Sequence, residues 1–597
     1  MPASCRTGPG GSVDTARGPV DRAAGPVDRA EGPVYIRCMS SDTKTTATIE
    51  RLAIALAQIN PTVGDIAGNA KLIREARDQA GAADLVVTGE LAISGYPPED
   101  LVLKSAFQDT VEAVIGELAG DTADGPALLV GAPWRNGTHL HNAALLLDDG
   151  TIAAVTYKHC LPNYGVFDEK RVFEAGPLPQ PLVCRGHSLG VMVCEDMWFP
   201  HPAAALARAG AEMLIVLNGS PFETDKLDER FDYANARVAD TGLSLVYVNL
   251  IGGQDELVFD GASFVLGANG ETDVRVPAWE RAVVSTEWSK ENGTWSCRAG
   301  TLAPAADLTE AVYRAMVVGL RDYVHKNGFP GVVLGLSGGI DSALSMAVAV
   351  DALGAANVHA VMMPSPYTSV ESLEDAAQCA EMLGVQLDEV SIEPAMKAFD
   401  EMLTPLFEGM EADVTEENIQ SRARGNLLMA ISNKMGHMLL TTGNKSEMSV
   451  GYATLYGDMC GGYSVLKDIY KTDVFKLSHW RNQNLPADVQ GPEGRVIPER
   501  IITKPPSAEL KPDQKDEDSL PPYDILDGIL KCLVEDEMSV AAAVGRGFEA
   551  ETVRRIWRML DLAEYKRRQA PPGVKTTRRA FGRDRRYPIT NRFRGHI

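Results

Sequence analysis

The feature that most constrains the fold is a glycine-rich turn near the middle of this 597-residue chain. A β-branched, apolar run at 332–334 leads into Ser337-Gly338-Gly339, and an alanine-rich segment with helical periodicity follows from Ser342. Such a run is typical of a strand buried on both faces, as in parallel sheets covered by helices. A glycine-rich turn between a parallel strand and a helix predicts an anion site, because free backbone N–H groups and the positive end of the helix dipole meet there.

The residues of this turn indicate which kind of phosphate loop it is. No lysine stands where the Walker pattern needs one, and the G-x-G-x-x-G fingerprint of dinucleotide-binding folds is absent. The turn instead resembles the S-G-G-x-D-S loop of the pyrophosphatase-loop ATPases, which cleave ATP to AMP and pyrophosphate by adenylating a substrate. Its acidic residue, Asp341, is suited to hold a metal ion that rides on the phosphates.

Composition narrows the class of protein. The length predicts at least two domains. A net charge of -24 argues against nucleic acid as a partner. With no apolar run long enough to cross a bilayer and no signal-peptide core, we expect a cytoplasmic protein that does not bind membranes. The nine cysteines form no C-x-x-C pair, which indicates reduced thiols rather than disulfides or a zinc ribbon.

Residues 1–48 differ from the rest of the chain. They are rich in glycine, proline and alanine and contain the near-repeat GPVDR at 18–22 and 25–29. Such a segment has little to bury, so it is predicted to be disordered. It is either a short interaction arm or an over-called start with Met39 as the true initiator, and we favour the second interpretation.

Residues 49–285 are predicted to form a first α/β domain, because strand-like runs alternate with helical patterns. Polar residues follow three of these runs: Glu90 after 85–88, Lys158 in VTYKH, and Cys194 at the end of GVMVC. The carboxyl ends of strands are where α/β proteins normally bind ligands. A cysteine at the end of a buried strand is most often an inert thiol, so the ordered set carries more weight than any single member.

These segments resemble the Glu–Lys–Cys triad of the nitrilase-type amidases, and GELAISGYPPED at 89–100 is especially similar to the glutamine amidase branch. The resemblance implies an α-β-β-α sandwich with Glu90, Lys158 and Cys194 as catalytic residues. A thiolate would attack the glutamine amide, a carboxylate would carry the proton, and an ammonium would stabilise the oxyanion. Three further positions match family residues that contact glutamine: Tyr164, Ser220 and Arg230.

A second domain is predicted at 306–597, after a segment at 286–305 that we interpret as a linker or edge hairpin. Strand-like runs at 358–363 and 387–392 follow the glycine-rich turn, and helical patterns separate them. This alternation predicts a doubly wound parallel sheet of Rossmann-like type.

Five motifs in this domain occur in order and resemble ammonia-using NAD synthetases: ENIQSRAR (417–424), LLTTGNKSE (439–447), GYATLYGD (451–458), LKDIYKT (466–472) and KPPSAEL (504–510). The combined resemblance covers nearly all of 49–570 and is to the glutamine-dependent NAD synthetases, a fusion of nitrilase-type amidase and synthetase. It implies a synthetase domain of the adenine nucleotide alpha hydrolase type.

The resemblance assigns roles to residues of the second domain. The expected ATP contacts are Ser337, Gly338, Gly339, Ile340, Asp341, Ser342, Thr442, Lys471 and Ser507. The expected deamido-NAD contacts are Asn418, Arg422, Glu447, Asp458 and Lys566. Asp341 and Glu447 are expected to bind Mg²⁺, since hard oxygen ligands suit that ion.

The implied reaction is amidation of deamido-NAD to NAD through an adenylate, with ATP as substrate and glutamine as the nitrogen donor. A homo-oligomer is expected, since synthetase domains of this family pair. Three alternatives were weighed: another amidating enzyme of the loop family, such as a GMP or asparagine synthetase; an amidase whose second domain only senses nucleotide; and a non-catalytic scaffold. No segment resembles the glutaminase domains of the first, and the intact residue sets argue against the other two.

Two charged segments near the C-terminus remain open to interpretation. The stretch 511–518 is either a solvated loop or, by resemblance, a mobile segment that covers the substrate. The basic run from Lys566 alone would suggest a nucleic-acid arm. Contact with substrate phosphates or an intersubunit patch explains it equally simply.

Overall fold

The structure is a computed structural model, and it describes residues 50–593 except 225, 292, 306, 512 and 513. The predicted lead at 1–48 therefore lies outside the described residues. Among the residues described, no helix is both long and apolar enough to cross a membrane.

In the described part of the chain, the first domain is built on two stacked sheets. The first sheet has the order β15-β14-β1-β2-β3-β4-β5 and the second the order β13-β12-β9-β8-β7-β6. The strands of the first sheet are β1 (Glu50–Gln58), β2 (Leu85–Val87), β3 (Ala127–Asn136), β4 (His139–Asp148), β5 (Thr151–Tyr157), β14 (Ala282–Glu291) and β15 (Thr294–Cys297). Those of the second are β6 (Leu182–Cys184), β7 (His187–Val193), β8 (Met213–Asn218), β9 (Leu245–Asn249), β12 (Phe264–Leu266) and β13 (Thr272–Arg275).

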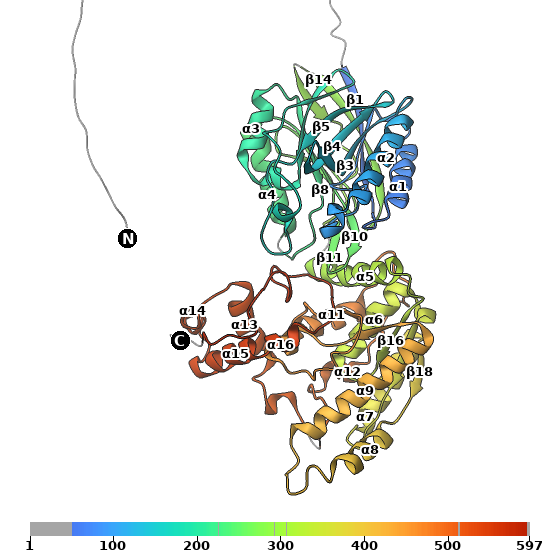
Figure 1. Ribbon diagram of the computed structural model, residues 1–597, viewed down its shortest axis with the longest axis vertical. Helices are drawn as coiled ribbons and strands as arrows, with labels where there is room; N and C mark the ends of the chain where they lie inside the picture. The colour runs from blue at the N-terminus through green and yellow to red at the C-terminus, as the bar shows by residue number, and fades with distance from the viewer. Residues whose placement is uncertain (1–49, 225, 292, 306, 512–513, 594–597) are drawn as a thin grey trace, which may run out of the picture. The chain divides into compact units, whose positions relative to one another are not determined.

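Helices cover the outer faces of both sheets. They are α1 (Ile66–Ala80) and α2 (Ser105–Asp121) on the first sheet, and α3 (Pro200–Arg208) and α4 (Lys226–Thr241) on the second (Figure 1). Strand β2 shows why: Leu85 and Val87 face the core between the sheets, whereas Val86 faces the core under α1 and α2. Successive side chains of a strand point to opposite faces, so an unbroken apolar run requires cover on both. The predicted α-β-β-α sandwich is confirmed.

The segment predicted as a linker at 286–305 needs a correction. Residues through Cys297 form strands β14 and β15, and β14 pairs antiparallel with β1 along its whole length. The edge-hairpin interpretation fits this part, and the first domain therefore continues beyond 285. Hydrogen bonding to a strand more than 200 residues earlier in the sequence is not visible in local composition.

The second domain has a parallel sheet of order β18-β17-β16-β19-β20. Its strands are β16 (Val332–Gly335), β17 (Val358–Met362), β18 (Gln386–Glu389), β19 (Met438–Thr441) and β20 (Tyr463–Ser464). Val332 and Leu334 pack into one hydrophobic core and Val333 into another, so β16 is buried on both faces. The predicted doubly wound sheet is confirmed. Strand β18 ends at Glu389, three residues before the end of the strand predicted at 387–392.

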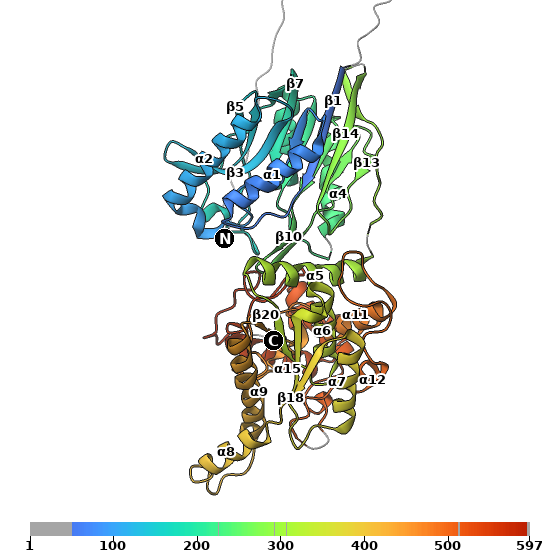
Figure 2. The same ribbon diagram turned by 90° about the vertical axis from the view of Figure 1, so that its right-hand side faces the viewer.

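Helices surround this sheet (Figure 2). They are α5 (Leu308–Lys326), α6 (Ile340–Leu353), α7 (Val370–Leu383), α8 (Glu393–Leu403), α9 (Val414–Met435), α10 (Lys445–Val450), α11 (Lys471–Gln483) and α12 (Glu499–Thr503). A separate core is formed by α13 (Tyr523–Leu530), α14 (Val540–Gly545) and α15 (Ala550–Leu562), and the short α16 (Glu564–Arg567) follows α15.

A hairpin of the first domain packs on helix α5. It consists of β10 (Ile251–Gln254) and β11 (Leu257–Asp260). Asp322 of α5 accepts hydrogen bonds from the Asn60 amide and from the backbone N–H of Gly253, both at 2.7 Å. Lys326 Nζ donates to Asn60 Oδ1 at 2.9 Å and to the Gly253 carbonyl at 2.8 Å. Buried polar contacts therefore join the two domains.

Candidate active sites

Cys194 begins a 3₁₀ turn (Cys194–Trp198) immediately after β7. Its φ of 45° is one that non-glycine residues rarely adopt and that is found disproportionately at functional sites. The buried Asp196 holds the turn: one carboxylate oxygen accepts from the N–H of Val193 at 3.1 Å. The other accepts from the N–H groups of His159 and Cys160 at 3.1 and 2.7 Å. Asp196 thus ties the Cys194 turn to the segment that follows Lys158.

Lys158 and Glu90 form a fully buried ion pair beside this turn. The ammonium lies 2.6 Å from Glu90 Oε1 and 2.8 Å from Glu169 Oε1. Glu90 also accepts from the Asn142 amide at 2.7 Å and from the Gly219 N–H at 2.9 Å. Burial lowers the pKa of Lys158, but the charges of Glu169 and Glu90 outweigh it and raise that pKa well above its usual value. The ammonium is therefore permanently charged.

The electrostatics of Cys194 fit a thiol that needs a base. Burial, followed by the charge of Glu90, raises the pKa of Cys194 well above its usual value, while Lys158 lowers it. The resting group is therefore a thiol rather than a thiolate. A nucleophile in that state requires a nearby carboxylate to take its proton. Glu90 is the carboxylate whose charge acts most strongly on it.

Glu169 and Asn142 belong to this site and were missed by sequence reasoning. Glu169 is buried, binds Lys158, and accepts from the Tyr96 hydroxyl at 2.9 Å. Burial raises the pKa of Glu169 to about 7, although the charge of Lys158 opposes the shift. The residue lies within NYGVFDEKR at 163–171, where a glutamate in a loop carries no local sign of burial.

The predicted glutamine contacts lie in different settings. Tyr164 is 53% exposed, and its hydroxyl donates to Glu195 at 3.0 Å. Ser220 is buried in the loop after β8. Arg230 uses all five of its donors inside the protein: two on Asp260, one on Ser220 Oγ, and one each on the carbonyls of Ser220 and Pro221. With all five donors used in this way, Arg230 holds the Ser220 loop, and its contact with glutamine stays a prediction.

In the second domain, the glycine-rich turn is held by its own serines. Ser342 Oγ lies 3.1 Å from Ser337 Oγ and 3.2 Å from the Ser337 nitrogen, and Ser337 Oγ accepts from the Gly339 N–H at 3.2 Å. Gly338 has a φ of 75°, and a Cβ there would meet the Ser372 carbonyl oxygen at 2.2 Å. Only glycine fits at that position. The turn precedes α6, so it has the geometry expected of a phosphate site.

Lys471 lies between the carboxylates of Asp341 and Glu447. Its Nζ is 2.5 Å from Asp341 Oδ2 and 3.2 Å from Glu447 Oε1. Asn444, missed by sequence reasoning, donates to Asp341 at 2.8 Å and accepts from the Glu447 N–H at 3.0 Å. Burial raises the pKa of Glu447 to about 8, while Lys471 lowers it and Asp341 raises it. The Lys471 ammonium contacts both carboxylates, so these carboxylates are close enough together to bind one Mg²⁺ ion through their oxygens.

These groups line a cavity of about 340 Å³ at the carboxyl ends of β16, β17 and β19. The predicted residues on its wall are Ser337, Gly339, Ile340, Asp341, Ser342, Thr442, Glu447, Asp458, Lys471 and Ser507. Asp516, from the predicted covering segment, also lines it. Ser507 is exposed, and its hydroxyl donates to the Gln514 carbonyl at 2.5 Å.

The remaining predicted deamido-NAD contacts gather around the loop at 451–458. Arg422 donates to the Leu455 carbonyl at 3.2 Å, and Asn418 accepts from Thr454 at 3.1 Å. Lys566 Nζ donates to the carbonyls of Gly451 and Ala453 at 2.8 and 2.6 Å. Among these residues only Asp458, which accepts from the Thr454 N–H at 2.8 Å, also lines the described cavity.

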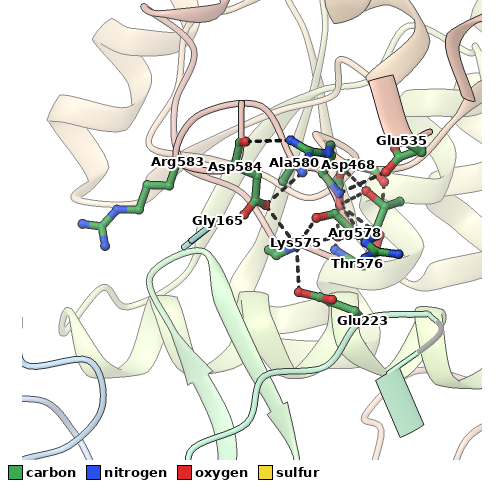
Figure 3. A network of polar contacts seen from close by, with 12 residues as sticks. Gly165, Glu223, Asp468, Glu535, Lys575, Thr576, Arg578, Ala580, Arg583 and Asp584 are labelled. Carbon is green, nitrogen blue, oxygen red and sulfur yellow. Dashed lines mark hydrogen bonds and ion pairs between the residues drawn. The ribbon is translucent and has the colours of Figure 1, made fainter. Parts of the chain in front are cut away.

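The C-terminal basic run joins the domains. We call residues 575–586 the C-terminal clasp (Figure 3). Lys575 is buried and lies 3.1 Å from Glu223 of the first domain and 3.0 Å from Asp584. Arg583 pairs with Glu99, and Arg586 donates to the Gly165 carbonyl at 3.3 Å. Lys575, Arg583 and Arg586 thus have partners within the chain, which none of the three earlier interpretations foresaw.

The clasp also reaches the synthetase site. Buried Asp468 accepts from the N–H groups of Thr576 and Thr577 at 2.8 and 2.7 Å. Its other oxygen lies 2.7 Å from the ammonium of Lys445, the residue after Asn444. Glu223, at the other end, is three residues beyond Ser220. Polar contacts of the clasp therefore run from Glu223, close in sequence to Ser220, to Lys445, which follows Asn444.

Comparison with known proteins identifies a family for each of the two domains. Residues 53–294 match the carbon-nitrogen hydrolase family and residues 312–570 the NAD synthase family. The glutamine-dependent NAD(+) synthetase of Rhodobacter capsulatus is 53% identical over 548 residues, 91% of this chain and 99% of the relative.

Solved structures agree over the same length. The glutamine-dependent NAD(+) synthetase of Acinetobacter baumannii, solved with adenosine diphosphate, is 42% identical with a TM-score of 0.72, covering 91% of this chain and 99% of that one. The enzyme of Cytophaga hutchinsonii, at 20% identity, shares the fold with a TM-score of 0.75 over 91% of this chain and 98% of its own. The chain belongs to the glutamine-dependent NAD(+) synthetases.

Proposed function

We propose that the chain makes NAD from deamido-NAD with glutamine as the nitrogen donor, and that the two sites described above divide the work. The observation that carries this proposal is the ammonium of Lys471 between Asp341 and Glu447, on the wall of the cavity that also holds the Ser337 turn. A site that activates a carboxylate with ATP needs a nucleophile, and the ammonia released at the buried Cys194 site would serve as that nucleophile.

In the first half-reaction, the proton of the Cys194 thiol passes to Glu90 as Sγ attacks the side-chain carbonyl carbon of glutamine. The oxyanion forms beside the Lys158 ammonium, which is held by Glu169 at 2.8 Å. Glu90 returns the proton to the departing ammonia and leaves a thioester. Glu90 then removes a proton from the water that attacks the thioester and returns that proton to the Cys194 sulfur, which releases glutamate and restores the thiol.

In the second half-reaction, the nicotinate carboxylate of deamido-NAD attacks the α-phosphate of ATP. Pyrophosphate leaves from the Ser337 turn, whose N–H groups and hydroxyls are placed to hold it. Ammonia then attacks the adenylate carbonyl, and AMP leaves as NAD forms. Mg²⁺, which Asp341 and Glu447 would hold, neutralises charge on the phosphates when bound. Asn418, Arg422, Asp458 and Lys566 are proposed to contact deamido-NAD.

The joining of two domains has a physical reason. Ammonia is mostly protonated in neutral water, and ammonium is not a nucleophile, so a sheltered passage preserves its reactivity. The contacts of α5 and of the clasp hold the two domains together. We also infer a homo-oligomer in which synthetase domains pair, and light scattering of the purified protein tests that point.

The direct test is to supply ATP, Mg²⁺, deamido-NAD and glutamine and to identify the products by mass. NAD, AMP, pyrophosphate and glutamate are expected. An amidase with a nucleotide-sensing domain would release glutamate without consuming ATP. ADP in place of AMP would contradict the adenylate.

A further inference from the structure

A cluster of metal-ligating side chains lies outside both sites. The cluster consists of His159, Cys160 and His201. Each residue offers one ligand atom, and the three atoms lie within 4.8 Å of one another. Cys160 Sγ is 3.7 Å from His201 Nε2. Zinc sites have Zn–S distances of about 2.3 Å and Zn–N distances of about 2.0–2.1 Å, so a tetrahedral S···N edge is about 3.6 Å. The observed separation therefore suits one shared ion.

His159 is already oriented as a metal ligand. Its Nδ1 lies 2.8 Å from the Gly176 carbonyl oxygen, so Nδ1 carries the proton and Nε2 keeps a free lone pair. Metal-binding histidines usually fix their tautomer through such a hydrogen bond. The rings of His159 and His201 meet edge-on, with centroids 5.3 Å apart. The amidase chemistry proposed above uses none of these three side chains.

The ligands come from two segments that the structure already joins. His159 and Cys160 follow strand β5 and hydrogen-bond through their N–H groups to Asp196. His201 lies in the first turn of α3 and is exposed, which leaves an entry path for an ion from solvent. Asp196 thus holds two of the ligands in place independently of any metal.

We propose that His159, Cys160 and His201 form a binding site for a thiophilic divalent transition metal of the zinc class, with the fourth coordination position open to solvent. Two imidazoles and a thiolate select such ions over Mg²⁺, which prefers oxygen ligands. Coordination displaces the proton of the Cys160 thiol, which passes to the buffer. The bound ion would fasten the segment after Lys158 to the helix after the Cys194 turn.

Co²⁺ is the probe, because thiolate ligation gives a near-ultraviolet charge-transfer band. The full-length protein carries Cys194→Ala, so the catalytic thiol cannot contribute, and excess Mg²⁺ occupies the carboxylates. One equivalent of Co²⁺ should produce the band, and added Zn²⁺ should abolish it. Cys160→Ser should remove the band, and His201→Ala should weaken binding at least about tenfold. Cys460→Ser, a partly exposed thiol of the second domain, is the matched control and should leave the band unchanged.

Ammonia-driven NAD synthesis confirms that the Cys160→Ser and His201→Ala proteins keep a working second domain, since that activity does not need the first domain's thiols. Zn²⁺ should also raise the melting temperature of the Cys194→Ala protein but not that of the Cys160→Ser variant. Absence of the band at a tenfold excess of Co²⁺ would overturn the proposal. A band that survives Cys160→Ser, or binding unaffected by His201→Ala, would do the same.

Discussion

At the amidase site the charged groups are sealed and already paired, whereas the synthetase cavity keeps its carboxylates partly exposed around one ammonium. The side chains of Lys158 and Glu90 have no exposed surface, but those of Asp341 and Glu447 retain 18% and 17%. A small neutral substrate suits the first arrangement. The arrangement in the synthetase cavity suits phosphates together with their cation.

The charges of the amidase site are balanced within the protein, whereas those of the synthetase site are completed by its substrates. The amidase groups are preorganised by one another, so removal of a member leaves an uncompensated buried charge or no nucleophile. The synthetase groups are balanced by Lys471 alone, and substrate charges complete the site.

Cys194→Ala should reduce glutamine-driven NAD formation by about a thousandfold or more, because no other thiol replaces the nucleophile. Ammonia-driven synthesis should stay within about twofold of the wild-type rate. The two rates are measured by NAD production with glutamine or with ammonium chloride. Loss of both would show that the sites are not separable.

Asp341→Ala should lower AMP release by about 100-fold or more with either nitrogen donor, since Lys471 and Asn444 lose their shared partner. Glutamate release by the first domain should persist. Chromatographic measurement of AMP and glutamate separates the two effects. Unchanged AMP release would remove Asp341 from the proposed cation site.

Local sequence patterns predict the secondary structure of this molecule well, but they do not predict contacts between residues far apart in the sequence. Strand–helix alternation and the Ser337 turn are local, so an α/β first domain and the parallel sheet of the second follow from them, whereas the sandwich was implied by the family resemblance. Glu169 could not be predicted, because its burial depends on a loop that returns to Lys158. Sequence also cannot show that Asp260 and Ser220 accept hydrogen bonds from Arg230. The clasp could not be predicted for the same reason, because Lys575 pairs with Glu223, a residue far from it in the sequence.

The affinity for Mg²⁺ should depend on pH through Glu447. Burial raises the pKa of this carboxyl to about 8, so it is protonated at lower pH and must lose the proton to bind a cation. Apparent affinity should rise by up to about tenfold per pH unit as pH approaches about 8, then level off. Isothermal titration calorimetry at several pH values measures the slope. In Glu447→Gln the slope should vanish, and a slope that persists would exclude this group.

Breaking the clasp should weaken coupling without harming either site alone. In Lys575→Met, NAD formed per glutamine hydrolysed should fall about fivefold, because Glu223 and Asp584 lose their shared ammonium. Ammonia-driven synthesis should change little. Arg546→Met, which breaks an exposed pair with Asp536 inside the second domain, is the matched control. Equal loss in both variants would indicate a general effect on stability.

The proposed reaction joins nitrogen freed at Cys194 to a carboxylate activated by AMP at the Ser337 turn. The most direct measurement supplies glutamine labelled with ¹⁵N in its side-chain amide, together with ATP, deamido-NAD and unlabelled ammonium at low concentration. Mass spectrometry of the products should show ¹⁵N in the NAD and one AMP for each NAD formed. NAD that carries only unlabelled nitrogen, or ADP as the nucleotide product, would contradict the account.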